Sequence, residues 1–368
     1  MINYCFVSGL YSRYDPLIFI RQGKSLVEAG YNVTYIVCDN KKDEVKDGIR
    51  IISTGFVPKN RINRFLYTKR IIKCFIDSID ADIYQISDPE LICLVSYLKK
   101  KKKKVVLNLR EYYPDLIRGK EYIPYIFRRL GSFFYTQLMK RYLPKYDHVF
   151  CPSLWILKLL QEEFEVNKSS LLANYPIVNA DYVLTSADYM GRYNTLCYEG
   201  TVYKISRQEK VFDALSNIPN IKYYIAGVIE EKYEDIYNHP YWSKVEFKNG
   251  FTLNELPGIF AKSTISNTLR DFEKQDGSSG VLKIFESMEA AIPILFSDVP
   301  LYRAIVDKYQ CGLCVNPNDS VQIAEAINYL IQHKGEAYEM GQRGRQAAIA
   351  EYNWQSQAVK YISIISKL

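Results

Sequence analysis

The chain has 368 residues, of which 48% are hydrophobic and 24% charged, which is enough apolar material for two globular domains. Its net charge of +7 is uneven, since residues 1–175 carry 29 Lys and Arg against 18 Asp and Glu, while the rest carry 19 against 23. The eight cysteines are scattered and predict no disulfide framework. With no signal-peptide pattern and no apolar run of roughly 18 residues, the sequence predicts a cytoplasmic protein.

In the first half, strand and helix patterns alternate. Asp15 and Pro16 form an N-cap and a first-turn proline, and the helix that they open is expected to end at Gly30. Strands are predicted at 2–7, 33–37, 51–52, 82–86, 105–107 and 149–151, with helices at 61–79, 89–98 and 127–143. This alternation predicts a parallel sheet with helices on both faces.

The pattern pauses near Asn174 and shows no clear period over 177–194. It then restarts, with strands predicted at 196–199, 222–226, 245–247 and 294–296, helices at 207–215 and 253–261, and two helices after residue 315. We therefore predict an α/β fold of two Rossmann-like domains facing a central cleft, residues 1–176 and 177–352. The helix at 353–368 can pack back on the first domain.

The most informative stretch is Gly277–Asp298, GSSGVLKIFESMEAAIPILFSD. A Gly- and Ser-rich loop that opens a helix offers backbone N–H groups and a positive dipole end to an anion such as phosphate. Lys283 and Glu286 are expected on the helix face away from the core, and Pro293 is expected to end the helix. The alternative is an ordinary strand-to-helix connection with solvated charges. The predicted core face consists of Val281, Ile284, Phe285, Met288 and Ile292.

The same stretch, continued by Cys311–Pro317 and by Tyr352-Asn353-Trp354, resembles the C-terminal half of the retaining family 4 glycosyltransferases of the GT-B fold. The N-terminal half contains short sequence motifs that also resemble this family, namely Tyr14-Asp15-Pro16, Asp88-Pro89-Glu90, Glu111-Tyr112-Tyr113-Pro114 and Asn174-Tyr175-Pro176. The resemblance covers nearly the whole chain and is most specific over 277–317. It implies a hexosyltransferase that uses a nucleotide-sugar donor, retains the anomeric configuration and needs no metal or other cofactor.

The resemblance also implies roles for particular residues. Glu286 matches the family's ribose-hydroxyl ligand, and Lys283 matches a lysine one helical turn before it. Arg207 matches a basic residue on the donor diphosphate, where a guanidinium would stabilise the leaving group; the alternative for Arg207 is a solvated residue at a helix start. Donor binding is assigned to Gly200, Thr201, Gly277, Ser278, Ser279, Gly280, Val281, Leu282 and Glu286. Arg207, Lys283 and Glu111 are assigned to catalysis, and Asp15, Asp88 and Arg110 to the acceptor side.

Three departures from the family pattern stand out. Ser278 replaces the first glutamate of the family's glutamate pair, Thr201 replaces an arginine, and Arg110-Glu111 replaces a His-Glu pair. They resemble a bacterial subgroup that builds surface polysaccharides such as O-antigen, as part of lipopolysaccharide, or capsule. Two alternatives stay open: a nucleotide-sugar epimerase, and a non-catalytic GT-B-like subunit that binds nucleotide or glycan for a partner enzyme.

The basic half suggests a membrane partner. Residues 60–73 and 125–146 interleave Arg and Lys with aromatic and aliphatic residues, a pattern that predicts peripheral binding to an anionic inner-membrane surface beside a polyprenyl-diphosphate-linked or glycan acceptor. The alternative is a solvated helix face. The run Lys99–Lys104 has charge without aromatics and no nucleic-acid motif, so no nucleic acid is expected. Cys311 and Cys314 lack a second ligand pair, so no metal is expected.

Overall fold

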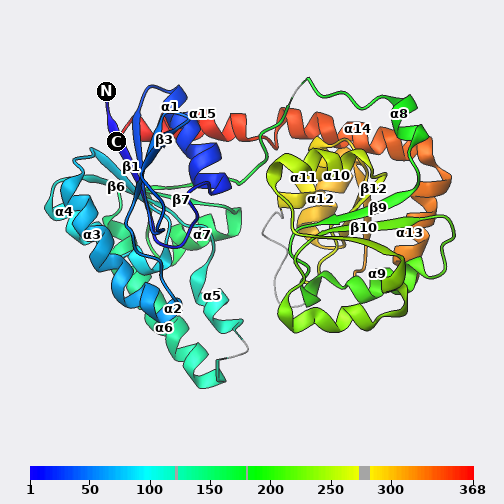
Figure 1. Cartoon of the computed structure of the whole chain (residues 1–368), viewed down its shortest axis with the longest axis horizontal. Coiled ribbons are helices and arrows are strands. Elements are labelled where there is room, and N and C mark those ends of the chain that lie inside the picture. The colour runs from blue at the N-terminus through cyan, green and yellow to red at the C-terminus, as the bar shows by residue number, and fades with distance from the viewer. Residues whose placement is uncertain (121–122, 180, 273–281) are drawn as a thin grey trace. The chain divides into compact units, whose positions relative to one another are not determined.

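The computed structural model describes residues 1–120, 123–179, 181–272 and 282–368, which form two compact units (Figure 1). The N-terminal unit comprises Met1–Asn174 and Gln355–Leu368, and the C-terminal unit comprises Tyr175–Trp354. The division after Asn174 lies close to the boundary expected after residue 176. Both units contain a largely parallel sheet with helices packed on it, which confirms the predicted α/β class.

The N-terminal unit contains a sheet of eight strands in the order β3-β4-β2-β1-β5-β6-β7-β8. Their bounds are β1 Asn3–Ser8, β2 Asn32–Val37, β3 Glu44–Lys46, β4 Ile49–Ser53, β5 Ile83–Ile86, β6 Lys104–Asn108, β7 His148–Cys151 and β8 Ser169–Leu171. Central strands such as β5 are buried along their whole length because helices cover both faces. Among these strands, only the β3–β4 pair is antiparallel. Strand β3 was not predicted, because its three residues are too few to show an alternation of apolar and polar side chains.

Helices and helical turns connect these strands. They are η1 Pro16–Gly23, α1 Lys24–Glu28, α2 Arg61–Asn63, η2 Arg64–Thr68, α3 Lys69–Ser78, η3 Pro89–Leu91, α4 Leu94–Lys100, α5 Tyr113–Arg118, α6 Tyr125–Tyr142, η4 Leu143–Lys145 and α7 Leu154–Glu162. The predicted N-cap is confirmed, because the Asp15 carboxylate accepts hydrogen bonds from the N–H groups of Leu17 and Ile18.

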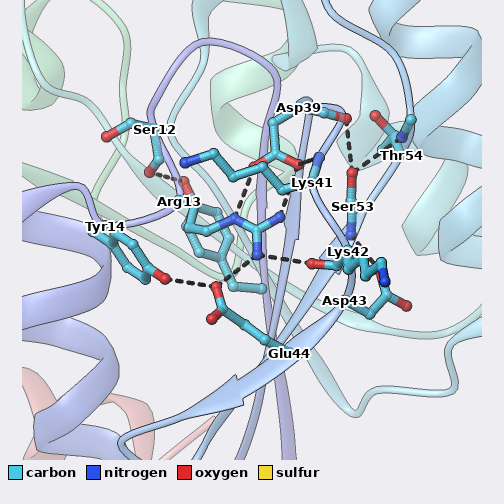
Figure 2. Close-up of polar contacts among 12 residues, drawn as sticks. Ser12, Arg13, Tyr14, Asp39, Lys41, Lys42, Asp43, Glu44, Ser53 and Thr54 are labelled. Atoms are coloured by element: carbon cyan, nitrogen blue, oxygen red, sulfur yellow. Dashed lines mark hydrogen bonds and ion pairs between the residues drawn. The ribbon is translucent and has the colours of Figure 1, made fainter.

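The segment after β1 is tied to the β2–β3 connection by Arg13 (Figure 2). The Arg13 guanidinium donates to Asp39 at 2.8 Å and to Glu44 at 2.6 Å, and the Ser53 hydroxyl donates to the Asp39 carbonyl at 2.7 Å. Although partial burial raises the pKa of Asp39, hydrogen bonds from Arg13 and Ser53 outweigh it, and the pKa lies below its usual value. The ion pairs of Arg13 with Asp39 and Glu44 therefore fix the loop that carries Asp15.

The last helix, α15 Trp354–Ile365, contributes to the core of the N-terminal unit. Tyr361 is fully buried, its hydroxyl donates to Gln85 at 2.7 Å, and the same hydroxyl lies 3.0 Å from the Tyr4 hydroxyl. Its ring packs on Phe150 at a centroid distance of 5.2 Å. Residues from both ends of the chain thus share one polar cluster within this unit.

The C-terminal unit contains a parallel sheet in the order β11-β10-β9-β12-β13-β14. Its strands are β9 Thr195–Glu199, β10 Lys222–Gly227, β11 Val245–Asn249, β12 Ile265–Asn267, β13 Ile294–Ser297 and β14 Gly312–Val315. Its helices are α8 Ser186–Gly191, η5 Lys204–Ser206, α9 Gln208–Leu215, η6 Glu231–Asn238, η7 Pro240–Lys244, η8 Leu253–Glu255, α10 Leu256–Ala261, α11 Leu282–Glu289, α12 Pro300–Tyr309, α13 Ser320–Gln332 and α14 Lys334–Ala350.

Two expectations about this unit were wrong. Helix α11 ends at Glu289 and not at Pro293, because Ala291 takes a left-handed conformation with φ 57° that ends the helix earlier. Three helices, α13, α14 and α15, follow β14 where two were expected, because a break at His333 that was not predicted separates α13 from α14. The predicted core face of α11 is confirmed at Ile284, Phe285 and Met288.

Candidate active site

Two glycines shape the end of β9, where the donor was predicted to bind. Gly200 has φ +100°, and its N–H donates to the Ala226 carbonyl at 2.9 Å. Gly227 has φ +156°, and a Cβ there would lie 1.8 Å from the Gly200 carbonyl oxygen. Only glycine allows this approach. A Cβ built on Gly200 would contact just the Lys283 ammonium, at 3.9 Å, so the Gly200 backbone faces that cation. Thr201 follows and is exposed.

Helix α11 supplies the two charged residues predicted for the donor site. The Lys283 ammonium lies 3.6 Å from the centroid of the Tyr198 ring, a cation–π contact, and it makes no ion pair within the described parts of the chain. Glu286, one turn later, is 9% exposed and so is more buried than a solvated face allows. Leu282 is the first residue of α11. Gly277, Ser278, Ser279, Gly280 and Val281 lie outside the described residues.

Arg207 is held by an aspartate that the sequence did not single out. Arg207 adopts a left-handed conformation, φ 48°, as the N-cap of α9, and its Nε donates to Asp271 at 2.9 Å. Asp271 also accepts from the Asn318 side chain at 3.1 Å, and its own N–H donates to the Ile205 carbonyl at 2.7 Å. Asp271 follows β12, a strand of three residues that shows no periodic pattern, so its position near Arg207 could not be predicted from the sequence.

A cavity of about 210 Å³ opens beside this ion pair. It is lined by residues at the end of β13 and in the segments that follow β12, β13 and β14, namely Arg270, Asp271, Phe272, Ser297, Asp298, Val299, Pro300, Asn316, Pro317 and Asn318. It therefore lies at the carboxyl ends of the strands, where ligands of open α/β sheets bind. Its lining combines amides, carboxylates and a guanidinium, groups that form hydrogen bonds with sugar hydroxyls.

Glu199 is a second residue that the sequence did not single out. It is the last residue of β9 and is 2% exposed, and neither carboxyl oxygen has a hydrogen-bond partner among the described residues. Burial raises the pKa of Glu199 to about 8, Lys283 opposes this rise, and Glu286 adds to it. In the sequence it is one polar residue at the end of an apolar strand, which is an ordinary position for a solvated side chain.

Two of the predicted acceptor-side residues, Asp15 and Arg110, form an ion pair. They follow β1 and β6, the two strands on either side of β5 in the sheet. The Arg110 guanidinium donates to Asp15 at 2.9 Å and lies 4.0 Å from the centroid of the Tyr11 ring. Burial raises the pKa of Tyr11 to about 12, while Arg110 and a hydrogen bond with Tyr113 lower it. Glu111 is exposed directly after Arg110.

Asp88 holds the loop after β1. It accepts hydrogen bonds from the Ser8 hydroxyl at 2.8 Å and from the N–H groups of Gly9 and Leu10 at 2.6 and 2.9 Å. Burial raises the pKa of Asp88 to about 7, and nearby Glu90 raises it further, while the three hydrogen bonds lower it. Asp15, Asp88 and Arg110 all act on the pKa of buried Tyr35, so the structure brings these three predicted residues together.

Two features are absent from the described residues. No group of three or more His, Cys, Asp or Glu side chains among them could hold a metal ion. No helix among them is long and apolar enough to span a bilayer.

Comparison with known proteins identifies both units. Residues 19–181 match the family model described as Glycosyltransferase Family 4, and residues 191–347 match the model described as Glycosyl transferases group 1. No curated protein matches the chain in sequence.

Solved structures are similar over the full length. The sucrose-phosphate synthase of Thermosynechococcus elongatus is 16% identical with a TM-score of 0.78, covering 100% of this chain and 99% of that one. HepE of Anabaena, in complex with UDP and glucose, is 12% identical with a TM-score of 0.72, covering 100% of both chains. A glycosyltransferase from Rickettsia africae is 17% identical with a TM-score of 0.67, covering 100% and 98%. At these identities the likeness establishes the fold. Since the two family models together account for most of the sequence, the chain is a glycosyltransferase of the GT-B fold, with a family 4 domain followed by a group 1 domain.

Proposed function

We propose that this glycosyltransferase moves a sugar from a nucleotide-sugar donor, held by the C-terminal unit, to a polyprenyl-diphosphate-linked or glycan acceptor on the inner face of the cell membrane, in surface-polysaccharide synthesis and with retention. Donor use is supported by the Gly200–Lys283–Glu286 arrangement, which offers an open backbone, a cation and a carboxylate at one sheet edge. Solved structures of similar fold contain UDP or a UDP-sugar.

The proposal that the protein binds a membrane rests on an exposed apolar surface of the N-terminal unit, which we call the ridge. Its residues are Ile62, Phe65, Leu66 and Tyr67 of α2 and η2, and Tyr125, Ile126, Phe127, Leu130, Phe133 and Phe134 of α6. Phe65 and Phe127 are 67% and 65% exposed, so these aromatic residues are not core residues. Isolated exposed apolar residues are normal, but ten on two helical segments indicate a binding surface.

The two segments of the ridge share an anchor. Arg64 of η2 forms an ion pair with Glu90 of η3, whose side chain is 4% exposed. Tyr135 of α6 donates to the Pro89 carbonyl of the same turn at 3.1 Å. Figure 1 shows α5 and α6 extending beyond the edge of the sheet. Both segments are therefore fixed to the turn that follows Asp88, on the acceptor side of the unit.

The basic residues on the helices of the ridge and on α3 are suited to an anionic lipid surface. Arg61, Lys69, Arg70, Arg129 and Lys140 are exposed on α2, α3 and α6, and α6 contains no acidic residue. Each basic residue near an anionic membrane contributes about 1 kcal/mol.

The run Lys99–Lys104 is a weaker candidate for membrane binding. Lys99 pairs with Asp147, Lys101 with Asp77 and Lys103 with Asp80, so much of its charge is already compensated.

Sedimentation with vesicles of phosphatidylglycerol and phosphatidylcholine tests the membrane part. A variant with Phe65, Leu66, Phe127 and Phe134 each changed to Ser should bind at least about tenfold more weakly, because each lost side chain removes apolar burial. A matched control changes four equally exposed residues outside the ridge, Val45, Val183, Val321 and Val359, to Ser and should bind as the parent does. Equal loss in both variants would contradict the ridge assignment.

Product analysis tests the reaction. Incubation with UDP-, GDP-, ADP- or CMP-sugars should give a product only when an acceptor is added, either vesicles that carry a polyprenyl-diphosphate-linked acceptor or a glycan. An altered nucleotide sugar formed without acceptor would support the epimerase alternative. Donor binding without turnover in the presence of any lipid extract would support the non-catalytic subunit.

A further inference from the structure

A buried carboxyl group without a partner needs a physical explanation, because leaving it unsatisfied destabilises the fold. Glu199 is such a group, and it lies one residue before Gly200 at the end of β9. The charged or titratable groups that act on it are Lys283 and Glu286 of α11 and Cys197 of its own strand. Of these, Lys283 is the only cation, and it forms no ion pair in the described parts of the chain.

The position of Lys283 suggests why Glu199 is retained. The Lys283 ammonium faces the Gly200 backbone, where the diphosphate of a nucleotide-sugar would be cradled if the proposed function is correct. Its charge is therefore available to one of two anions: the ionised Glu199 carboxylate or the donor phosphate. A second negative charge so close to the first disfavours binding of both.

We propose that Glu199 is a positioning residue that must take up a proton for the donor diphosphate to bind beside Lys283. In its neutral form it leaves the whole Lys283 charge to the phosphate. In its ionised form it attracts Lys283 away from the phosphate and repels the donor.

The size of the effect follows from burial. Burial raises the pKa of Glu199 to about 8, so the neutral form dominates at pH 7 and the ionised form at pH 9. The apparent dissociation constant varies inversely with the neutral fraction, which falls about tenfold over this interval. Burial raises the pKa of Cys197 to about 12, so this thiol does not ionise in the same range.

Calorimetry with UDP, GDP and ADP as probes, between pH 7 and pH 9 at constant ionic strength, tests the proposal. For the parent protein, the dissociation constant of the diphosphate that binds should rise about tenfold from pH 7 to pH 9. For Glu199→Gln, which keeps the shape but cannot ionise, it should change less than about twofold. A pH dependence unchanged in Glu199→Gln, or no pH dependence in the parent, would overturn the proposal.

A second measurement needs no variant. Titrations of the parent in buffers of different ionisation enthalpy count the protons taken up on binding. About half a proton should be taken up at pH 8, where the nucleotide phosphate is already ionised, since its second pKa is about 6. If no proton is taken up, the role of Glu199 is refuted, while the donor site is not. Failure of all three nucleotides to bind at pH 7 would instead refute the donor site and this inference with it.

Discussion

At the residue scale, the C-terminal unit places Arg207 in an ion pair with Asp271, and this pair fixes the guanidinium before any ligand arrives. A fixed cation stabilises a leaving diphosphate without reorganisation. Arg207→Ala should therefore slow turnover by about 10² to 10³ with a smaller effect on nucleotide affinity. Asp271→Asn should slow it less, since the guanidinium remains but is less well oriented.

Glu286 should act on binding instead. Glu286→Ala should weaken nucleotide affinity by roughly 1 to 3 kcal/mol, the scale of a hydrogen bond to a charged group. Titration calorimetry and initial rates measure both effects. Arg343→Ala is the control, because the partly buried Arg343 guanidinium donates to the Gln310 carbonyl and to no other described residue. Unchanged affinity in Glu286→Ala, or unchanged turnover in Arg207→Ala, would contradict these assignments.

Glu199 should also affect stability. Burial raises its pKa to about 8 from the ordinary value of 4.5, so the folded state binds a proton more tightly than the unfolded state. The contribution of Glu199 to stability is therefore fully present below pH 4.5 and is lost as the pH rises to 8, by on the order of 4 kcal/mol between pH 5 and pH 8. Glu199→Gln should make the decline in urea unfolding less steep, whereas Glu231→Gln, at an exposed position, should leave it unchanged. A smaller decline remains in Glu199→Gln, because burial also raises the pKa of Asp88, to about 7. An equally steep decline in Glu199→Gln and in the parent would contradict the contribution of Glu199.

At the element scale, the approach of the loops after β9 and β10 depends on Gly227. Gly227→Ala places a Cβ 1.8 Å from the Gly200 oxygen and forces a residue with a side chain to adopt φ +156°. We expect loss of nucleotide binding and a lower midpoint of unfolding, because the two backbones must separate.

Variants at two other glycines distinguish the effect of the close contact from that of the positive φ. Gly250 has φ +75° but open space around its Cβ position, so Gly250→Ala measures conformational strain alone. Gly258 in α10 has open space and no such conformation, so Gly258→Ala should be neutral or stabilising. If Gly227→Ala binds nucleotide as well as Gly250→Ala does, the close contact with Gly200 is not required.

At the scale of the whole molecule, the chain returns to the N-terminal unit at its end, and α15 completes the core there. Tyr361→Ala should destabilise the protein by about 3 to 5 kcal/mol, the cost of removing a large buried aromatic side chain. Tyr361→Phe should cost less, because it keeps the buried ring and loses only the hydroxyl, with its hydrogen bonds to Gln85 and Tyr4. Urea unfolding measures both, with Val359→Ala on the exposed face of α15 as the control. Equal stability of Tyr361→Ala and the control would contradict a structural role for α15.

Much of this protein could be predicted from local pattern. Alternating apolar runs predicted both parallel sheets, the Asp15 cap and the core face of α11, because each depends on residues that are neighbours in sequence. Short elements were missed for the same reason. Strands β3 and β12 have three residues each, fewer than a period needs to be recognised, and the early end of α11 depends on one backbone conformation at Ala291.

The sequence by itself determined the fold class, the basic first half and the likeness to family 4 glycosyltransferases. Only the tertiary structure decided which polar residues meet. Glu199 and Lys283 come together because β9 and β12 are neighbours in a sheet whose order differs from the chain order. Asp271 reaches Arg207 for the same reason, and the exposure of the ridge depends on what packs against α2 and α6. Local periodicity does not contain strand order or burial, because both follow from long-range packing.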